Sequence, residues 1–311
     1  MNTLRQAAQE YLNMRRSLGY KLRETSKRLL DFVTFMEQRR ASYITQSLAL
    51  VWAKQPSDVQ PYEWARRLSC VRSFARHRSA TDPRTQIPPA GLLPYRPKRA
   101  QPYMYSDEEI KELLRAALKL PAKHGLRPWT YHCLFGLLSV AGLRVSEAQN
   151  LELQDVDVRA SVLTIRGAKF GKSRLVPLHP STRKVLVHYM ARREQVWANR
   201  SVSSYLFVSG WGNRLDGGDI RRTFYALSRQ IGLRGPSDCH GPRLHDLRHG
   251  FASKTLLRWY RAGEDAERRL PILSAYLGHV HWSDTFWYLS ALPELMHEAM
   301  SRLEQRWEGR Q

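Results

Sequence analysis

The residues between His245 and Tyr288 have the types and the order that attack on a phosphodiester requires. The chain reads HDLRH at 245–249, YLGH at 276–279 and WY at 287–288. His245 and Arg248 are three positions apart, so they share a face if this segment is helical. In such an arrangement Tyr288 would be the nucleophile and Arg248 would bind non-bridging phosphate oxygens. His245 and His279 would then transfer or share protons.

A second arginine and two lysines lie upstream of this stretch. Arg144 stands in the segment GLRVSE at 142–147, and Lys169 and Lys172 stand in the segment GAKFGKSR at 167–174. A guanidinium group matches two phosphate oxygens, so Arg144 could share the neutralisation of phosphate charge with Arg248. A lysine in a turn between two strands could protonate the oxygen that leaves.

Together these motifs resemble the tyrosine recombinase (phage-integrase type) family, closely over roughly residues 100 to 290 and loosely before that. The resemblance implies a catalytic set of Arg144, Lys169, His245, Arg248, His279 and Tyr288, supported by Glu147 and Lys172. The offset from the LGH motif favours Tyr288 over Tyr276 as the nucleophile. Counting back from RLVPL at 174–178 favours Lys169 over Lys172 as the general acid. Asp246 and His249 are expected to have structural or supporting roles.

The resemblance also implies a reaction, a site-specific recombination or integration of DNA. Tyr288 would attack one strand, form a 3′-phosphotyrosyl link and free a 5′ hydroxyl. A 5′ hydroxyl of a partner duplex would reverse the step through a Holliday junction. Because the covalent link conserves the bond energy, neither a cofactor nor a metal is expected. The expected partner is double-stranded DNA at specific sites, bound by a homotetramer on paired sites, with or without a second recombinase. The segment LSALPE at 289–294 is similar to a transposon-associated branch.

Two other functions share this chemistry or this fold. A type IB topoisomerase would use the same groups to relax DNA as a monomer. A catalytically silent DNA-binding protein would keep the fold without the reaction, but the complete set of candidate catalytic residues counts against it.

Composition and charge agree with a nucleic-acid partner. The 311 residues include 50 Lys and Arg against 28 Asp and Glu, which gives a net charge of +22. Such an excess predicts a polyanionic partner, and its spread along the whole chain favours nucleic acid over a membrane surface. Three scattered cysteines argue against a disulfide framework and a zinc site. The N-terminus lacks a signal-peptide core, and the apolar run 134–143 is too short to cross a bilayer. A cytoplasmic, nucleoid-associated protein is therefore expected.

The first part of the chain is predicted to be a helical DNA-binding domain over residues 1–80. Apolar positions at helical spacing predict helices near 2–18, 24–40, 48–53 and 62–78, with Trp52, Trp64 and Phe74 in the core. Residues 81–104 are rich in proline and basic residues, which indicates an extended linker. The candidate phosphate contacts in these two regions are Arg66, Arg72, Arg76, Arg96, Lys98 and Arg99.

Residues 105–311 are predicted to form the catalytic domain, which ends in a helical tail. SDEE at 106–109 is a capping box that starts a helix, and the apolar segment 129–141 predicts a buried central helix. Short strands are predicted at 156–158, 162–165 and 175–178. Further helices are predicted at 180–197, 217–231, 243–260, 271–277 and 284–289. The fold class is therefore mainly α with a small antiparallel β-sheet in the C-terminal domain. By resemblance, the two domains would form a clamp around DNA.

Overall fold

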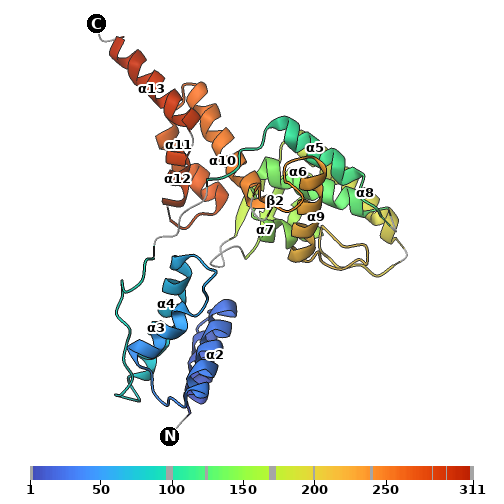
Figure 1. The fold of residues 1–311 in the computed structure, drawn as a ribbon. Helices are drawn as coiled ribbons and strands as arrows, with labels where there is room; N and C mark the ends of the chain where they lie inside the picture. Colours follow the sequence, from blue (N-terminus) through green and yellow to red (C-terminus); the bar gives the residue numbers. More distant parts are fainter. Residues whose placement is uncertain are drawn as a thin grey trace. The chain divides into compact units, whose positions relative to one another are not determined.

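A computed structural model describes residues 3–95, 101–122, 125–167, 173–198, 200–238, 241–281, 283–291 and 293–308. The chain divides into two compact units, Met1–Ala100 and Gln101–Gln311. The first is blue to teal in Figure 1, and the second runs from green to red.

The first unit consists of helices with one shared apolar core. Its helices are α1 (Leu4–Ser17), α2 (Arg23–Gln38), α3 (Gln46–Lys54) and α4 (Pro61–Arg78). Trp52 and Phe74 are fully buried, and Trp64 packs against the same core, so these aromatic side chains are structural as the spacing predicted. The buried Trp52 indole donates a hydrogen bond to Asp31, and Arg67 lies over its ring.

The proline-rich segment after α4 is attached to the first unit as far as Leu93. The backbone N–H of Gln86 donates to the Ile44 carbonyl at 2.8 Å. Arg72 donates to the carbonyls of Pro88 at 2.7 Å and Pro89 at 2.9 Å. Leu93 is buried in the helical core. The predicted linker is therefore packed against the helices of the first unit as far as Leu93, because two proline carbonyls and one leucine find partners there.

The second unit is mainly helical and contains a small sheet. Its first elements are α5 (Asp107–Leu118), α6 (Arg127–Ala141), α7 (Val145–Gln149), the 3₁₀ turn η1 (Leu153–Asp155), β1 (Val156–Asp157), β2 (Val162–Ile165) and β3 (Arg174–Pro177). These are followed by α8 (Pro180–Trp197), α9 (Gly217–Gln230), α10 (Leu244–Arg261), α11 (Ala266–Leu277), α12 (Ser283–Ala291) and α13 (Pro293–Glu308). The three strands are antiparallel in the order β1-β2-β3, with Leu163 opposite Val176.

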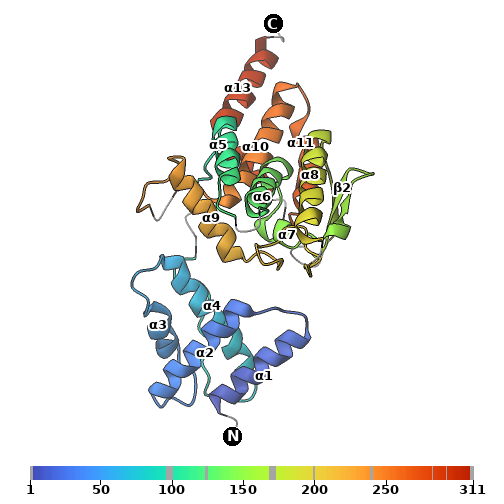
Figure 2. The ribbon, with the colours of Figure 1, turned by 90° about the vertical axis from the view of Figure 1, so that its right-hand side faces the viewer.

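Helix α6 lies at the centre of the second unit, against α5, α7, α8 and α10 (Figure 2). Eight of its residues are buried, from Thr130 to Ala141, so both faces of the helix meet other elements. Gly142 ends α6, and α7 follows after two residues. Helix α10 packs directly on α6, and its own residues from Leu244 to Gly250 are mostly buried. This packing brings the GLRVSE segment beside the HDLRH segment.

The mostly helical fold class with a small antiparallel sheet is confirmed. The sequence does not predict the short helix α7, and α11 starts earlier than predicted. The sequence predicts a helix from Pro271, whereas α11 begins at Ala266. The Asp265 side chain accepts a hydrogen bond from the N–H of Arg268 and starts the helix upstream. Pro271 lies in the second turn and lacks only one backbone donor there.

The C-terminal tail forms the helix α13, which contacts α10 and α12. Arg261 of α10 donates to Glu298 of α13 at 3.2 Å. Apolar residues of this tail, among them Met296, Met300 and Trp307, recur in the sequence at the spacing of one helix face, which is called the apolar stripe. The side chains of these three residues are exposed. Contact with its own unit therefore leaves these three apolar side chains of α13 uncovered.

Two further findings concern the described ranges alone. No helix there is both long and apolar enough to cross a membrane. The same residues include no group of three or more His, Cys, Asp or Glu side chains placed to hold a metal ion.

Candidate active site

Glu147 is the acidic centre of a cluster of arginines in the second unit. Its carboxylate accepts two hydrogen bonds from the Arg174 side chain, at 3.0 and 2.8 Å. It accepts two more from Arg144, one from the side chain at 2.7 Å and one from the backbone N–H at 2.9 Å. Burial would raise the pKa of Glu147, but the hydrogen bonds from Arg174 and Arg144 lower it to about 2. A carboxylate that is always ionised holds both guanidinium groups in fixed positions.

Arg248 lies at the bottom of the same cluster and is almost entirely buried. Its guanidinium group donates to the Gly142 carbonyl at 2.7 Å and to the Leu277 carbonyl, and it lies 3.9 Å from a Glu147 oxygen. Burial and the nearby charge of Arg144 lower the pKa of Arg248 to about 10. At that value the side chain remains cationic, so the site keeps a concentrated positive charge.

Two glycines allow the ends of α6 and α11 to approach these arginines. Gly142 and Gly278 both adopt left-handed backbone conformations, with φ of 59° and 66°. A Cβ atom on Gly142 would lie 2.5 Å from the Phe251 ring, and one on Gly278 would lie 3.1 Å from Arg174. The Gly278 carbonyl accepts a hydrogen bond from Arg144 at 2.8 Å. The glycines of the GLR and LGH motifs are therefore required by the backbone and by close packing.

The three histidines of the motifs have lowered pKa values, so they are neutral at neutral pH. Burial and the charge of Arg248 lower the pKa values of His245 and His279 to about 4. Burial and neighbouring His245 lower the pKa of His249 to about 3. Nδ1 of His279 is 2.7 Å from the hydroxyl oxygen of the buried Thr285. A neutral imidazole has one ring nitrogen with a lone pair, so each of these side chains can accept a hydrogen bond.

Tyr288 comes from α12 and is only 2% exposed. Its hydroxyl oxygen lies 3.0 Å from Nδ1 of His249, and its ring stacks 6.3 Å from that of His279. Trp287 packs edge-on against Tyr288 with ring centroids 5.5 Å apart. The predicted nucleophile therefore lies among the motif histidines.

Tyr276, the other tyrosine weighed as nucleophile, has a different environment. Its hydroxyl donates to the Ala141 carbonyl at 3.3 Å, and its ring stacks on Phe251. Burial raises its pKa, which makes the phenol less reactive. These contacts connect α11 to the end of α6, as expected for a structural residue.

Arg144 and His245 also line an open cavity of about 470 Å³ on the second unit. Its other lining residues include Arg221 and Tyr225 of α9, together with Arg243 at the start of α10. The three arginines Arg144, Arg221 and Arg243 give this cavity a positive charge that suits an anionic ligand.

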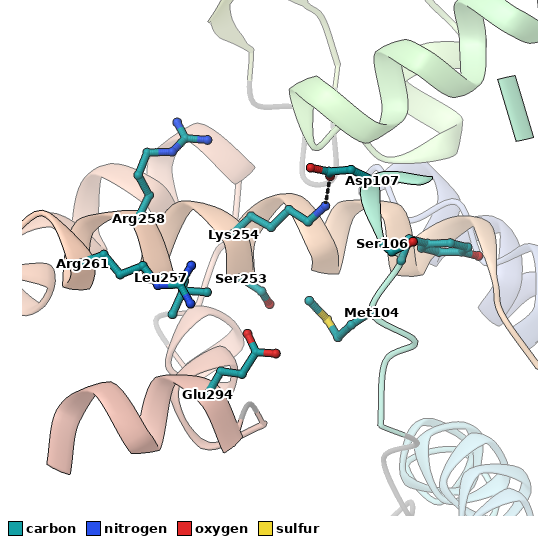
Figure 3. A pocket seen from close by; sticks show the side chains of 10 residues that line it. Met104, Ser106, Asp107, Ser253, Lys254, Leu257, Arg258, Arg261 and Glu294 are labelled. Carbon is teal, nitrogen blue, oxygen red and sulfur yellow. Dashed lines mark hydrogen bonds and ion pairs between the residues drawn. The ribbon is translucent and has the colours of Figure 1, made fainter. Parts of the chain in front are cut away.

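A second cavity of about 580 Å³ lies further along α10, near the start of α13 (Figure 3). It is lined by Met104, Tyr105, Ser106, Asp107, Ser253, Lys254, Leu257, Arg258, Arg261 and Glu294. Lys254 donates to Asp107 across its edge at 2.5 Å. None of the candidate catalytic residues that the structure describes lines it.

The remaining predicted residues either lie outside the described residues or belong to the first unit. Lys169, Lys172, Arg96, Lys98 and Arg99 lie outside the described residues. In the first unit Arg66 pairs with Glu63, Arg76 is exposed, and Arg72 holds the proline carbonyls described above. Arg72 therefore has a structural partner already.

The sequence does not predict Arg174 as a residue of the site, because its carboxylate partner is 27 positions away and no spacing rule connects them. The sequence predicts a structural or supporting role for His249, and the structure adds its contact with the Tyr288 hydroxyl. Its position four residues after His245 on one helix was the available signal.

Comparisons with known proteins agree with the motifs and the fold. The sequence profile of the phage integrase family matches residues 104–294. A protein of Sinorhizobium fredii named as an integrase/recombinase, y4rB, is 65% identical over the full length of both chains. The tyrosine recombinase XerC of Thermodesulfovibrio yellowstonii is 29% identical over 71% of this chain and 68% of its own. The Tn1549 transposon integrase, solved in complex with transposon right-end DNA, has a TM-score of 0.68 at 15% identity, covering 96% of this chain and 98% of that one.

The fold and the family match define a recombinase of the tyrosine class. This chain belongs to the phage integrase family. The family and the tyrosine-type site-specific recombinase class that the sequence motifs predicted are thereby confirmed.

Proposed function

We propose that this chain cuts and rejoins DNA strands at specific sites through a 3′-phosphotyrosyl intermediate. The observation that carries the proposal is the convergence of α7, α10, α11 and α12 on one site. They bring Arg144, Arg248, His245 and His279 to the neighbourhood of Tyr288. Two arginines would neutralise the phosphate, and Tyr288 would attack it.

The chemistry needs each of these groups for a physical reason. A phosphodiester repels nucleophiles because it is anionic, and the arginine pair offsets that charge. Arg144 is the more accessible of the two, since it also lines the open cavity, so it would meet the phosphate first. Lys169 would donate a proton to the leaving 5′ oxygen, with Lys172 as the alternative. The intermediate conserves bond energy, so no cofactor or metal is required.

We infer that the active assembly is a homotetramer on paired sites, where a Holliday junction connects two duplexes. The exposed Met296, Met300 and Trp307 of α13 support this inference, because apolar side chains on a helix need a covering surface. A neighbouring protomer would provide it. The net charge of +22 supports contact with DNA by both units and a location at the nucleoid in the cytoplasm.

The direct test is to map covalent protein–DNA joints on the native flanking DNA. We expect wild-type protein to form a 3′ adduct at one sequence, and Tyr288→Phe to form none while still binding that sequence. Tyr276→Phe is the matched control, because it removes a nearby phenol that bonds to a backbone carbonyl, and it should still form the adduct. An adduct that persists in Tyr288→Phe would contradict the proposal. Relaxation of supercoils without junction products would indicate a topoisomerase.

A further inference from the structure

His249 lies where one helix of the site meets the nucleophile. It follows Arg248 on α10, and its ring is enclosed by three aromatic neighbours. The ring centroids of His245, Trp287 and Tyr288 lie 4.6, 5.2 and 5.4 Å from that of His249. With only 9% of its surface exposed, the imidazole has little freedom to turn.

Nδ1 of His249 lies 3.0 Å from the Tyr288 hydroxyl oxygen, which is hydrogen-bond distance. Burial keeps this imidazole neutral at physiological pH, so one ring nitrogen carries a lone pair. Where the tautomer has its proton on Nε2, Nδ1 accepts from the tyrosine hydroxyl. The other two motif histidines have different surroundings: Nδ1 of His279 faces Thr285, and His245 lines the open cavity.

We propose that His249 is a further catalytic residue, whose Nδ1 holds the Tyr288 hydroxyl and takes its proton during attack. This inference rests on the proposed function. As the bond from the Tyr288 oxygen to phosphorus forms, the bond from phosphorus to the 5′ oxygen breaks. The hydroxyl proton passes to Nδ1, and the leaving 5′ oxygen takes a separate proton from the hairpin lysine. In the rejoining step both protons return along the same paths.

Three variants separate this role from simple packing. His249→Phe keeps a ring of similar shape and removes both nitrogens. His249→Asn places an amide near the position of Nδ1, and His249→Gln places it near the position of Nε2. We expect His249→Phe to slow adduct formation on the order of 100-fold. His249→Asn should recover about tenfold of that loss, because its amide oxygen can hold the Tyr288 hydroxyl although it cannot take the proton, and His249→Gln should recover less.

The measurement is single-turnover adduct formation by the full-length protein. The substrate is a nicked duplex that carries the cleavage position mapped for the wild-type protein. Equal rates for His249→Phe and wild type would overturn the proposal. So would rescue by Gln that equals or exceeds rescue by Asn, since that would place the needed nitrogen at Nε2.

A second reaction does not use the tyrosine hydroxyl. It therefore tests whether the effect of His249→Phe is confined to attack by Tyr288. In Tyr288→Phe, added hydrogen peroxide can serve as the nucleophile at the same phosphate, using the same arginines. We expect the double variant Tyr288→Phe/His249→Phe to support this cleavage at the rate of Tyr288→Phe. A fall as large as that in adduct formation would show that His249 supports the arginine cluster instead. Failure of the proposed function would look different, because wild-type protein would then form no adduct.

Discussion

At the residue scale, the site is a network in which the Glu147 carboxylate holds several arginine side chains in place. Glu147 has a side chain only 4% exposed, and it binds Arg144 and Arg174 directly. Removal of one partner from a buried ion pair leaves the other charges uncompensated, which costs far more than the loss of a surface pair. The supporting role that the sequence suggested for Glu147 is therefore also a structural one.

We expect Glu147→Gln to destabilise the protein by about 3 kcal/mol or more and to reduce adduct formation with it. Glu63→Gln is the matched control, since Glu63 also bridges two arginines, Arg28 and Arg66, but is 21% exposed. It should cost about 1 kcal/mol or less. Chemical denaturation of the full chain measures both. Equal losses would contradict the view that burial makes the Glu147 cluster important.

The lowered pKa values of the histidines predict how stability depends on pH. His245, His249 and His279 titrate at about 4, 3 and 4 in the folded protein, against 6.5 ordinarily. Between about pH 6.5 and 4 the unfolded chain therefore binds protons that the folded chain does not. Stability should be fully present above about pH 6.5 and should fall as the pH falls towards 4. Thermal melting at constant ionic strength checks this, and His249→Phe should show a shallower slope. A flat profile would count against histidines that stay neutral in the folded site.

Much of the site could be predicted from residue spacing, but not all of it. Arg144, His245, Arg248, His279 and Tyr288 stand in short motifs, and helix geometry or a fixed offset connects them. The part played by Arg174 depends on how β3, α7 and α11 pack together. The spacing of residues along the chain does not show packing between elements that are far apart in the sequence.

At the scale of elements, strong periodicity and caps predicted the helices well. The capping box at Ser106 starts α5, and the apolar run before Gly142 forms the buried α6. The predicted start of α11 is wrong by five residues. The prediction begins the helix at Pro271, whereas Asp265 caps it upstream. Strand β3 begins at Arg174, whose Nε donates to the Tyr276 carbonyl at 2.6 Å. One stem of the hairpin is therefore tied to α11 and, through Glu147, to α7.

The hairpin carries the predicted general acid, and a modified substrate can test it. We expect Lys169→Ala to slow cleavage of ordinary DNA by about 100-fold or more, because the leaving 5′ oxygen then lacks a proton donor. A substrate with sulfur in place of that bridging oxygen should restore the rate, since a thiolate leaves without a proton. Lys172→Ala is the matched control and should show little defect. If Lys172→Ala shows the rescue instead, the alignment of the hairpin is off by three residues.

At the scale of the whole molecule, the sequence predicted a basic protein built from a helical part and a mainly helical catalytic part. It did not predict that residues up to Leu93 pack on the first unit. The proline content predicts an extended segment, but composition does not show that backbone carbonyl groups in it accept hydrogen bonds from Arg72. The apolar stripe of the tail predicts its helix. The exposure of that stripe raises the question of whether the tail helps protomers to assemble.

Deletion of residues 292–311 should leave binding to a single DNA site largely intact. Assembly of two paired sites should weaken by about tenfold or more, and recombination should fall with it, because the exposed apolar side chains of α13 would no longer meet a neighbour. Gel mobility of single-site and paired-site complexes measures the two effects separately. Met296→Lys with Met300→Lys is the matched full-length variant and should reproduce the assembly defect. Full-yield pairing by the truncated protein would rule out this role for the tail.

The hydrogen bonds that Arg248 donates to two backbone carbonyl groups affect the choice of variants for genetic experiments. Gly142 and Leu277 stand at the ends of two helices, and one side chain joins both. An allele that removes Arg248 would damage the fold together with the reaction, and its phenotype would mix low abundance with lost chemistry. An allele that only removes the Tyr288 oxygen leaves this junction intact. A dominant-negative copy of the gene, which must fold and occupy its site in order to interfere, should therefore be built at the tyrosine.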